Sequence, residues 1–227
     1  RVGCSGWTST CTWKGTITLT VDHLTMFAVF AVAKEASKPE VITFKDMRGH
    51  WAADTVSKLA DMDIISGYPD GTFRPDNTIT RAEMACIMAR VLKLTPGNGS
   101  VPNFADKNEI PAWARGAVAA AAREGLFKGY PAPQGTVVFK PDGPITRVEL
   151  AAILSRVVET RCTAVAGRAP AFIDAAEIPA WAKNAIEAAT AAGIVGGYPD
   201  GTFRPKSSVT RAEAASMILR LLEKESG

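Results

Sequence analysis

The sequence predicts a mainly α protein made of three helix–loop–helix repeats that follow a short N-terminal β segment. Three observations support this prediction. One block of residues recurs three times from Phe44 onward, which is the signature of a repeat architecture. Within each block, apolar residues recur at helical spacing on both sides of a loop rich in glycine and proline. The segment before the first block instead alternates and is rich in β-branched and aromatic residues, as strands are.

Composition and charge exclude several classes of protein. The 227 residues are 47% hydrophobic and 22% charged, a globular composition long enough for one sizeable domain or a few small ones. The formal net charge of +3 comes from 26 basic and 23 acidic residues, a balance that argues against nucleic-acid binding. The apolar stretch "LTMFAVFAVA" (24–33) is too short for a transmembrane segment and is interpreted as a buried strand. No Cys/His spacing indicates a metal site, and no motif indicates a cofactor.

The N-terminal segment differs in kind from the rest of the chain. "WKGTITLTVDHLTMFAVFAV" (13–32) predicts a pair of strands, and residues 1–38 are interpreted as the end of an upstream β-domain with its linker. No signal peptide is visible and the chain opens within strand-like sequence, so we expect it to be part of a longer protein. "DHLTMFAV" (22–29) resembles the end of the cleavage motif of autoproteolytic GAIN domains. A plain buried strand is the favoured interpretation, because Thr-Val-Asp stands where that motif has Cys-x-Cys.

The cysteines give two further expectations. Cys4 and Cys11 lie close together in a Ser/Thr/Gly-rich segment that suits a hairpin, so a local disulfide and free thiols both stay open. Cys86 falls within an apolar helical pattern and is interpreted as a small buried hydrophobic residue.

The repeated block has a fixed order of motifs. It begins with Phe-x-Asp, continues with a tryptophan, and reaches the tyrosine of Gly-Tyr-Pro seventeen residues after that tryptophan. Phe-Arg/Lys-Pro and then Thr-Arg-x-Glu complete it. Linkers rich in Gly, Pro and Ala separate the blocks, so we place the repeats at 39–97, 98–165 and 166–227. Repeat 2 departs from the others by a loop four residues longer and by Lys140 in place of arginine, and repeat 1 is two residues shorter before its tryptophan.

Each repeat predicts two helices around a loop. Apolar residues 5, 8 and 13 positions after the tryptophan form a stripe along the first helix. Pro-Asp-Gly in the loop favours a tight turn, and the prolines exclude helix there. The second helix is predicted to start at Thr80, Thr146 or Thr210, with apolar residues 7, 8, 11 and 12 positions later. Because one pair of such helices cannot bury both stripes, we expect the three repeats to pack together.

An arginine follows the helix-initiating threonine in all three repeats. Threonine and the glutamate three residues later predict a capping box, which needs no arginine. A cation at this end of a helix opposes the helix macrodipole, so an anion should compensate it. Two candidates stay open. One is an aspartate of the Phe-x-Asp motif in an internal ion pair. The other is an anionic ligand, held by the guanidinium and by free N–H groups at the helix start.

Phe-x-Asp, Trp, Gly-Tyr-Pro-Asp-Gly-Thr-Phe-Arg-Pro and Ile-Thr-Arg-Ala-Glu, in this order, resemble the S-layer homology domain over residues 44 to about 224. The resemblance implies a pseudo-threefold spindle of three repeats around a central helical bundle, with grooves between neighbouring repeats. It also implies non-catalytic, non-covalent anchoring of a secreted or S-layer protein to the cell surface. The ligand implied is a secondary cell-wall polysaccharide that carries an acidic pyruvate ketal on N-acetylmannosamine. Because repeats 1 and 2 depart from the pattern, equal binding by the three grooves is not expected.

Four residue types in each repeat are the candidate polysaccharide-binding residues. The arginine would bind the acid, and the tryptophan is interpreted either as a core residue or as a platform for a sugar ring. The aspartate either caps the first helix or accepts from sugar hydroxyls, and the glycine is a turn residue that also lets backbone approach a sugar. The tyrosine of Gly-Tyr-Pro and the phenylalanine of Phe-Arg/Lys-Pro are interpreted as core. The candidates are Asp46, Trp51, Gly67 and Arg81; Asp106, Trp113, Gly129 and Arg147; Asp174, Trp181, Gly197 and Arg211.

A second function stays open beside polysaccharide anchoring. The repeats could assemble with protein neighbours in a surface lattice, with the arginines paired internally. Within 39–227 the sequence has no nucleophile–base pair, metal cluster or phosphate loop, and His50 has no equivalent in the other repeats. The sequence therefore predicts no enzyme activity for this region.

Overall fold

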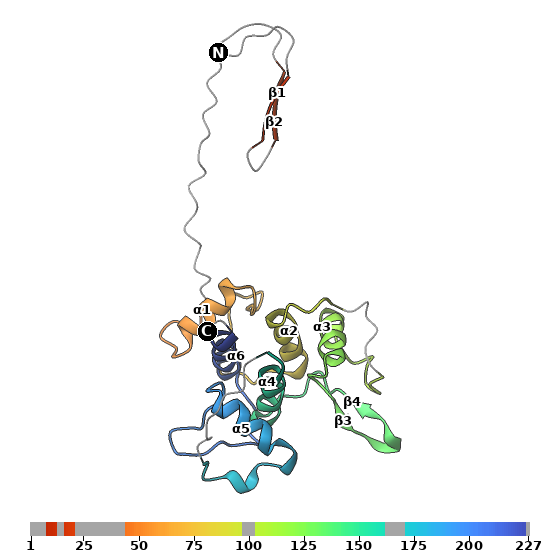
Figure 1. Cartoon of the computed structure of the whole chain (residues 1–227), viewed down its shortest axis with the longest axis vertical. Helices are drawn as coiled ribbons and strands as arrows, with labels where there is room; N and C mark the ends of the chain where they lie inside the picture. Colours follow the sequence, from red (N-terminus) through yellow and green to blue (C-terminus); the bar gives the residue numbers. More distant parts are fainter. Residues whose placement is uncertain (1–7, 13–15, 21–43, 97–102, 162–170, 226–227) are drawn as a thin grey trace. The chain divides into compact units, whose positions relative to one another are not determined.

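The computed structural model describes residues 8–12, 16–20, 44–96, 103–161 and 171–225 (Figure 1). They belong to two units, divided between Glu40 and Val41. The predictions made for 22–33 and for Cys4 lie outside these residues, as do 97–102 and 162–170, which join the repeats. The described part is mainly helical, as predicted.

The N-terminal unit contributes one hairpin. Strand β1 (Thr8–Thr12) pairs antiparallel with β2 (Thr16–Thr20), and Thr10 lies opposite Thr18. The short N-terminal β segment is therefore confirmed, with one strand before Trp13 and the other inside the predicted range 13–32.

Within the described part of the second unit, each repeat supplies two α-helices. The first repeat has α1 (Ala53–Asp61) and α2 (Arg81–Val91), the second α3 (Ala112–Arg123) and α4 (Arg147–Arg161), and the third α5 (Lys183–Ala191) and α6 (Arg211–Glu225). Short 3₁₀ turns η2 (Ala175–Glu177) and η3 (Ala180–Ala182) precede α5. The predicted stripes of the first helices are buried: Val56, Leu59, Ile64, Val118, Ala121, Leu126, Ile186, Ala189 and Ile194.

The second helices begin where the capping motif predicts. Thr80 is the N-cap of α2, its hydroxyl accepts from the Glu83 amide at 3.2 Å, and Glu83 in turn accepts from the Thr80 amide at 2.9 Å. Thr210 and Glu213 repeat both bonds at α6. At α4 only one of the two bonds is present, in which the Thr146 amide donates to the Glu149 carboxylate. The Thr146 hydroxyl is buried without a partner.

Just after each first helix, the residue twelve positions beyond the tryptophan takes the left-handed backbone conformation. Gly125 and Gly193 take φ values of 71° and 75° there, a conformation that costs glycine nothing. Repeat 1 places Asp63 at the same point with a φ of 57°. Aspartate is one of the few other residues that tolerate this region, so all three repeats turn at the same place.

The first helix of each repeat packs against the second helix of the preceding repeat. The pairs are α2 with α3, α4 with α5, and α6 with α1. The last pair joins the two ends of the repeat unit, so the repeats form a closed ring (Figure 1). In this ring α2, α4 and α6 lie inside and α1, α3 and α5 lie outside.

A cycle of three backbone hydrogen bonds lies at the centre of the ring. The Ile79 amide donates to the Val209 carbonyl at 3.0 Å, Val209 to Ile145 at 2.9 Å, and Ile145 back to Ile79 at 3.1 Å. All three side chains are fully buried. Because each bond joins equivalent residues of different repeats, the arrangement has the pseudo-threefold symmetry that the sequence repeats imply.

The loop between the two helices is held by the aspartate of Phe-x-Asp. The Asp46 carboxylate accepts from the amides of Phe73 and Arg74 at 2.8 and 2.6 Å. Asp106 and Asp174 bind the equivalent amides of their own repeats. These bonds seat Phe73, Phe139 and Phe203 in the core, where each is almost completely buried, as predicted. The aspartates thus fasten loops, and the expectation that they cap the first helix is wrong.

The longer loop of repeat 2 forms a small hairpin. Strand β3 (Tyr130–Pro131) pairs antiparallel with β4 (Val137–Val138), and the 3₁₀ turn η1 (Pro133–Gly135) connects them. The insertion therefore projects from the loop without changing the position of Phe139 or of α4, because Asp106 still binds the amides on either side of that point.

We expect the loop-fastening aspartates to make stability depend on pH. Burial alone would raise the pKa of Asp174, but the Phe203 and Arg204 amides outweigh it and the net pKa lies below its usual value. A lowered native pKa means stability that is present above the unfolded pKa and lost as pH falls through the native pKa.

The Asp174→Asn variant should therefore be less stable at pH 7 by about 1 kcal/mol, since solvent screens a partly exposed carboxylate. Its free energy of unfolding, measured by urea denaturation, should also fall less steeply below about pH 4 than that of the parent. Asp61→Asn, at an exposed position at the end of α1, is the matched control and should behave as the parent does. Equal pH profiles for the parent and Asp174→Asn would contradict the assignment.

Candidate functional site

The three arginines of Thr-Arg-x-Glu are buried and reach into the next repeat. Arg81, Arg147 and Arg211 are only 4–6% exposed. Each donates its Nε–H to the carbonyl of the buried phenylalanine in the following repeat: Arg81 to Phe139 at 2.7 Å, Arg147 to Phe203 at 2.9 Å, and Arg211 to Phe73 at 2.8 Å. The last bond closes the ring from repeat 3 to repeat 1.

The helix starts beside these arginines are not free to bind an anion. The Arg81 and Ala82 amides donate to the Gly143 and Pro141 carbonyls at 3.0 Å, and the helices of repeats 2 and 3 make equivalent bonds to the loop of the next repeat. The expectation of free N–H groups at this point is therefore wrong. Loop carbonyls of the neighbouring repeat satisfy the N-terminal amides that a helix leaves open.

The internal partner of the arginine is a glutamate rather than an aspartate. Arg211 Nη1 lies 2.9 Å from Glu83 Oε1, and Arg147 Nη1 lies 3.5 Å from Glu213 Oε1. Their Nη2 groups donate to the carbonyls of Ser66 and Gly196. The prediction of a pair with the Phe-x-Asp aspartate is wrong, because those carboxylates already hold loop amides.

The tyrosine of Gly-Tyr-Pro joins the same cluster. Tyr68 donates to Glu83 Oε1 at 3.0 Å and Tyr198 donates to Glu213 Oε1 at 2.5 Å, while Tyr130 donates to Glu149. These tyrosines are half-buried rather than core residues. Burial and the bond to Glu149 raise the pKa of Tyr130 to about 12.

Two cations lie over each tyrosine ring. The guanidiniums of Arg74 and Arg211 stand 4.0 and 4.9 Å from the centroid of Tyr68. Tyr198 has Arg204 and Arg147 at 4.1 and 4.4 Å, and Tyr130 has Arg81 at 4.4 Å and Lys140 at 5.0 Å. A tyrosine face attracts cations, so the tyrosine and glutamate of each repeat form one polar cluster with the buried arginine of the preceding repeat.

Each cluster forms the floor of a groove, and we number the groove after the repeat that supplies the tyrosine. The cavity volumes are about 580, 400 and 700 Å³ for grooves 1, 2 and 3. Groove 1 is lined by Tyr68, Glu83, Arg90, Arg211 and Trp113; groove 2 by Tyr130, Glu149, Arg156, Arg81 and Trp181; groove 3 by Tyr198, Glu213, Arg220, Arg147 and Trp51. Every groove therefore takes its buried arginine from the preceding repeat and its tryptophan from the following one.

The tryptophans lie at the surface, so their interpretation as core residues is wrong. Trp51, Trp113 and Trp181 are 62–65% exposed, and each lines a groove. An exposed indole beside a polar groove has an apolar face and one N–H that a ligand in the groove could contact.

The glycines line the grooves with backbone alone. A Cβ on Gly67 would stand 2.3 Å from the Phe44 ring and 2.6 Å from the Thr72 carbonyl oxygen. Gly129 and Gly197 face the equivalent Phe104 and Phe172. The absent side chain therefore makes room for the repeat's own phenylalanine, and the space it leaves is not open to a ligand.

A second arginine in each groove was missed by the sequence analysis. Arg90, Arg156 and Arg220 stand nine residues after the buried arginines. Arg156 donates to the Leu126 carbonyl at 2.5 Å, and burial lowers its pKa. The spacing of nine was visible in all three repeats. Arginine on the polar face of a helix, however, carries no signal by itself.

The grooves differ in charge and in the freedom of the buried arginine. Groove 2 is lined by three cations, Arg81, Arg156 and Lys128, and one carboxylate, Glu149. Groove 1 has two cations and one carboxylate, and groove 3 has two of each. Among the described residues, Arg81 has no carboxylate within ion-pair distance, unlike Arg147 and Arg211. Burial lowers the pKa of Arg81, which Tyr130 and Glu149 offset only in part.

Groove 1 also contains a thiol. Cys86 is half-buried, packs against the core and lines groove 1, so it is less enclosed than predicted, and its burial raises the pKa of the thiol. Among all the described residues, no group of three or more His, Cys, Asp or Glu side chains is arranged to hold a metal ion. None of the described helices has the length and apolar character to cross a bilayer.

Comparisons with known proteins match the repeats. The S-layer homology domain family matches at residues 43–85, 103–151 and 171–215. Amylopullulanase of Thermoanaerobacterium thermosulfurigenes is 35% identical over 93% of this chain, which is 11% of that protein. Cell surface glycoprotein 1 and the cellulosome-anchoring protein of Acetivibrio thermocellus are 39% and 38% identical over 70% of this chain, which is 7% and 35% of their lengths. The chain thus spans a minor part of each relative.

The ring-closing arginine should be needed for stability. We expect Arg211→Met to lower the free energy of unfolding by about 3 kcal/mol, because it removes the buried donor of the Phe73 carbonyl and the ion-pair partner of Glu83. Arg90→Met, at an exposed position of groove 1, should cost less than about 1 kcal/mol. Equal losses in urea denaturation would show that Arg211 does not close the ring.

The groove glycines should be far less tolerant of a side chain than their neighbours. Gly197→Ala would bring a methyl group within 2.8 Å of Phe172 and 3.0 Å of the Thr202 carbonyl oxygen, which should cost about 1–3 kcal/mol. Gly196→Ala, one residue earlier, meets nothing closer than 3.9 Å and should leave the thermal midpoint nearly unchanged. If both variants melt alike, packing against Phe172 is not what requires glycine.

Proposed function

The chain belongs to the S-layer homology family, and we propose that its three grooves bind an acidic cell-wall polysaccharide and so tether a larger protein to the cell surface. The observation that carries this proposal is one constellation that recurs three times. A buried arginine and a tyrosine lie on the groove floor, a second arginine lines the same groove, and an exposed tryptophan stands at the edge.

The chain is a module of the cell surface, as its family and the names of its relatives agree. Its relatives include an enzyme, the amylopullulanase, as well as an anchoring protein and S-layer proteins. They share the repeats with this chain, which spans 11% of the amylopullulanase. Attachment accounts for a part common to all of them, and we therefore assign this part no catalysis.

The chemistry of each groove suits an acidic sugar. A guanidinium binds a carboxylate through two parallel N–H groups, and its enclosure on the groove floor strengthens that pairing. The exposed indole offers an apolar face to a pyranose ring and an N–H to one of its polar substituents. We propose that the acid is the pyruvate ketal of an N-acetylmannosamine residue, held by the arginine, with the sugar ring against the tryptophan.

Three grooves in one ring also fit a polymeric ligand. A polysaccharide that carries many copies of the acidic sugar can occupy several grooves at once. Each further contact is then intramolecular and prolongs attachment without any new kind of interaction. Weak grooves can in this way hold a large surface protein in place.

Assembly with neighbouring proteins is the second candidate, because exposed aromatic side chains also occur at protein interfaces. The two functions differ in what the tryptophans contact. Polysaccharide binding requires the sugar and no protein, whereas a lattice contact requires a second protein surface and would appear as self-association in light scattering.

Tryptophan substitutions test the proposal more cleanly than arginine substitutions. Because the indoles are exposed, replacing Trp51, Trp113 and Trp181 together by alanine should change stability by less than about 0.5 kcal/mol for each site. Binding to purified pyruvylated wall polysaccharide, measured by co-sedimentation, should be lost, and the parent should also lose it when the pyruvate is removed from the polymer. Undiminished binding to the depyruvylated polymer would contradict the proposed role of the arginines.

A further inference from the structure

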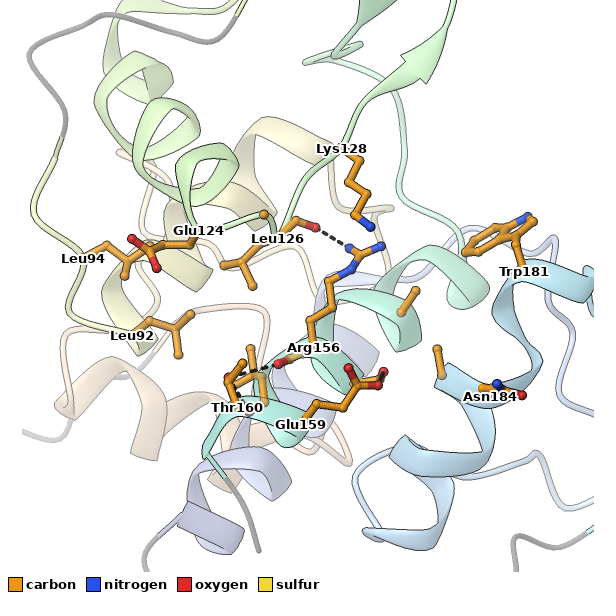
Figure 2. Close-up of a pocket in the computed structure, with 15 residues that line it drawn as sticks. Leu92, Leu94, Glu124, Leu126, Lys128, Arg156, Glu159, Thr160, Trp181 and Asn184 are labelled. Carbon is orange, nitrogen blue, oxygen red and sulfur yellow. Dashed lines mark hydrogen bonds between the residues drawn. The ribbon is translucent and has the colours of Figure 1, made fainter. Parts of the chain in front are cut away.

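A pocket continues groove 2 along the outer face of α4. It has a volume of about 680 Å³, and its lining includes Leu126, Lys128, Ala152, Arg156 and Trp181, all of which also line groove 2 (Figure 2). We call it the upper pocket. Because five lining residues are common to both cavities, groove 2 and the upper pocket form one continuous site.

The continuous site is longer than one sugar ring. Its α4 side runs from Glu149 to Thr160, which is about 16 Å along the helix axis at the usual rise per residue. Arg156 lies in the middle of the site (Figure 2). Leu126, which follows α3, is on one side of it, and Trp181 and Asn184 are on the other. A ligand that occupied groove 2 alone would end near Arg156 and leave about 6 Å of this length, as far as Thr160, unfilled.

Charge changes along the site. Groove 2 carries three cations and one carboxylate, so it favours an anion. In the upper pocket Glu124 and Glu159 balance Lys128 and Arg156. Its other polar groups are hydroxyls and an amide, from Ser155, Thr160 and Asn184. A balanced set of donors and acceptors suits a neutral ligand rich in hydroxyl groups.

Lys128 lies where groove 2 meets the upper pocket. Figure 2 shows its side chain extending toward the Arg156 guanidinium, and it lines both cavities. Repeats 1 and 3 have Ser66 and Gly196 at the equivalent position before Gly-Tyr-Pro. The second repeat alone therefore places a third cation where the acidic part of a ligand would give way to the neutral part.

We propose that groove 2 and the upper pocket form one extended glycan site, in which an acidic sugar at Arg81 is followed by neutral sugars held by Lys128, Asn184 and Glu159. This inference rests on the proposed binding of an acidic polysaccharide. It adds that recognition in the second repeat extends beyond the acidic sugar, and that the glycan runs from Glu149 toward Thr160 along α4.

The test compares two probes on the whole chain. One is the methyl glycoside of pyruvylated N-acetylmannosamine. The other is a trisaccharide with that sugar at one end and two neutral N-acetylhexosamines. Binding is followed by NMR at the indole N–H signals of Trp113, Trp181 and Trp51, which report grooves 1, 2 and 3 within one sample.

At Trp181 the trisaccharide should bind at least about tenfold more tightly than the monosaccharide, as two or three added hydrogen bonds would give. Trp51 and Trp113 should show a smaller ratio. Asn184→Ala should remove most of the gain at Trp181 and leave the affinity for the monosaccharide unchanged. Asp54→Ala is the matched control, because Asp54 follows Trp51 by the same three residues, and it should leave the gain at Trp181 unaltered.

The outcomes separate this inference from the proposed function. If the monosaccharide shifts the indole signals but the trisaccharide binds no more tightly at Trp181, the extended site is refuted and the grooves remain acid-sugar sites. A gain of the same size at all three indoles would also refute it, since the effect would then not belong to the upper pocket. If neither probe binds, the proposed function itself fails.

Discussion

The bond from the buried arginine to the phenylalanine carbonyl of the next repeat is the interaction on which the rest of the structure depends. It links sequence positions as far apart as Arg211 and Phe73. Together with the cycle of three backbone hydrogen bonds at the centre of the ring, it joins the last repeat to the first. The same side chain then presents its remaining N–H groups to the groove. One residue thus stabilises the ring and forms part of the floor of a groove. Its cost is the burial of a guanidinium, which carbonyls, a tyrosine face and a glutamate compensate.

That compensation differs among the grooves, and the difference has a chemical meaning. Where a glutamate pairs closely with the arginine, an incoming carboxylate has to compete with it for the guanidinium. Arg81 lacks such a pair among the described residues, so a ligand acid would add a missing partner rather than displace one. The lowered pKa of Arg81 has the same origin, because burial is only partly offset there. Equal motifs in the sequence therefore do not produce equal sites.

Local patterns predicted the local structure well. Thr80 and Glu83 fixed the start of α2 because both partners of a capping box lie within one turn. The partners of Asp46 and Arg211 were beyond such reasoning, since they lie 27 and 138 residues away and depend on how the repeats close. The tryptophans were undecided for a related reason. A helix start beside a loop fits either a core or a surface position, and only the neighbouring repeat determines which of them applies.

Every groove combines residues of all three repeats, and this limits how such a module can change by recombination. An isolated repeat contains a tyrosine and a glutamate but has neither the arginine nor the tryptophan of its own groove. Exchanging one repeat for another would alter one groove through its floor, a second through its arginine and a third through its tryptophan. The ligand specificity of such a module would therefore depend on all three repeats together, even though their sequences are similar.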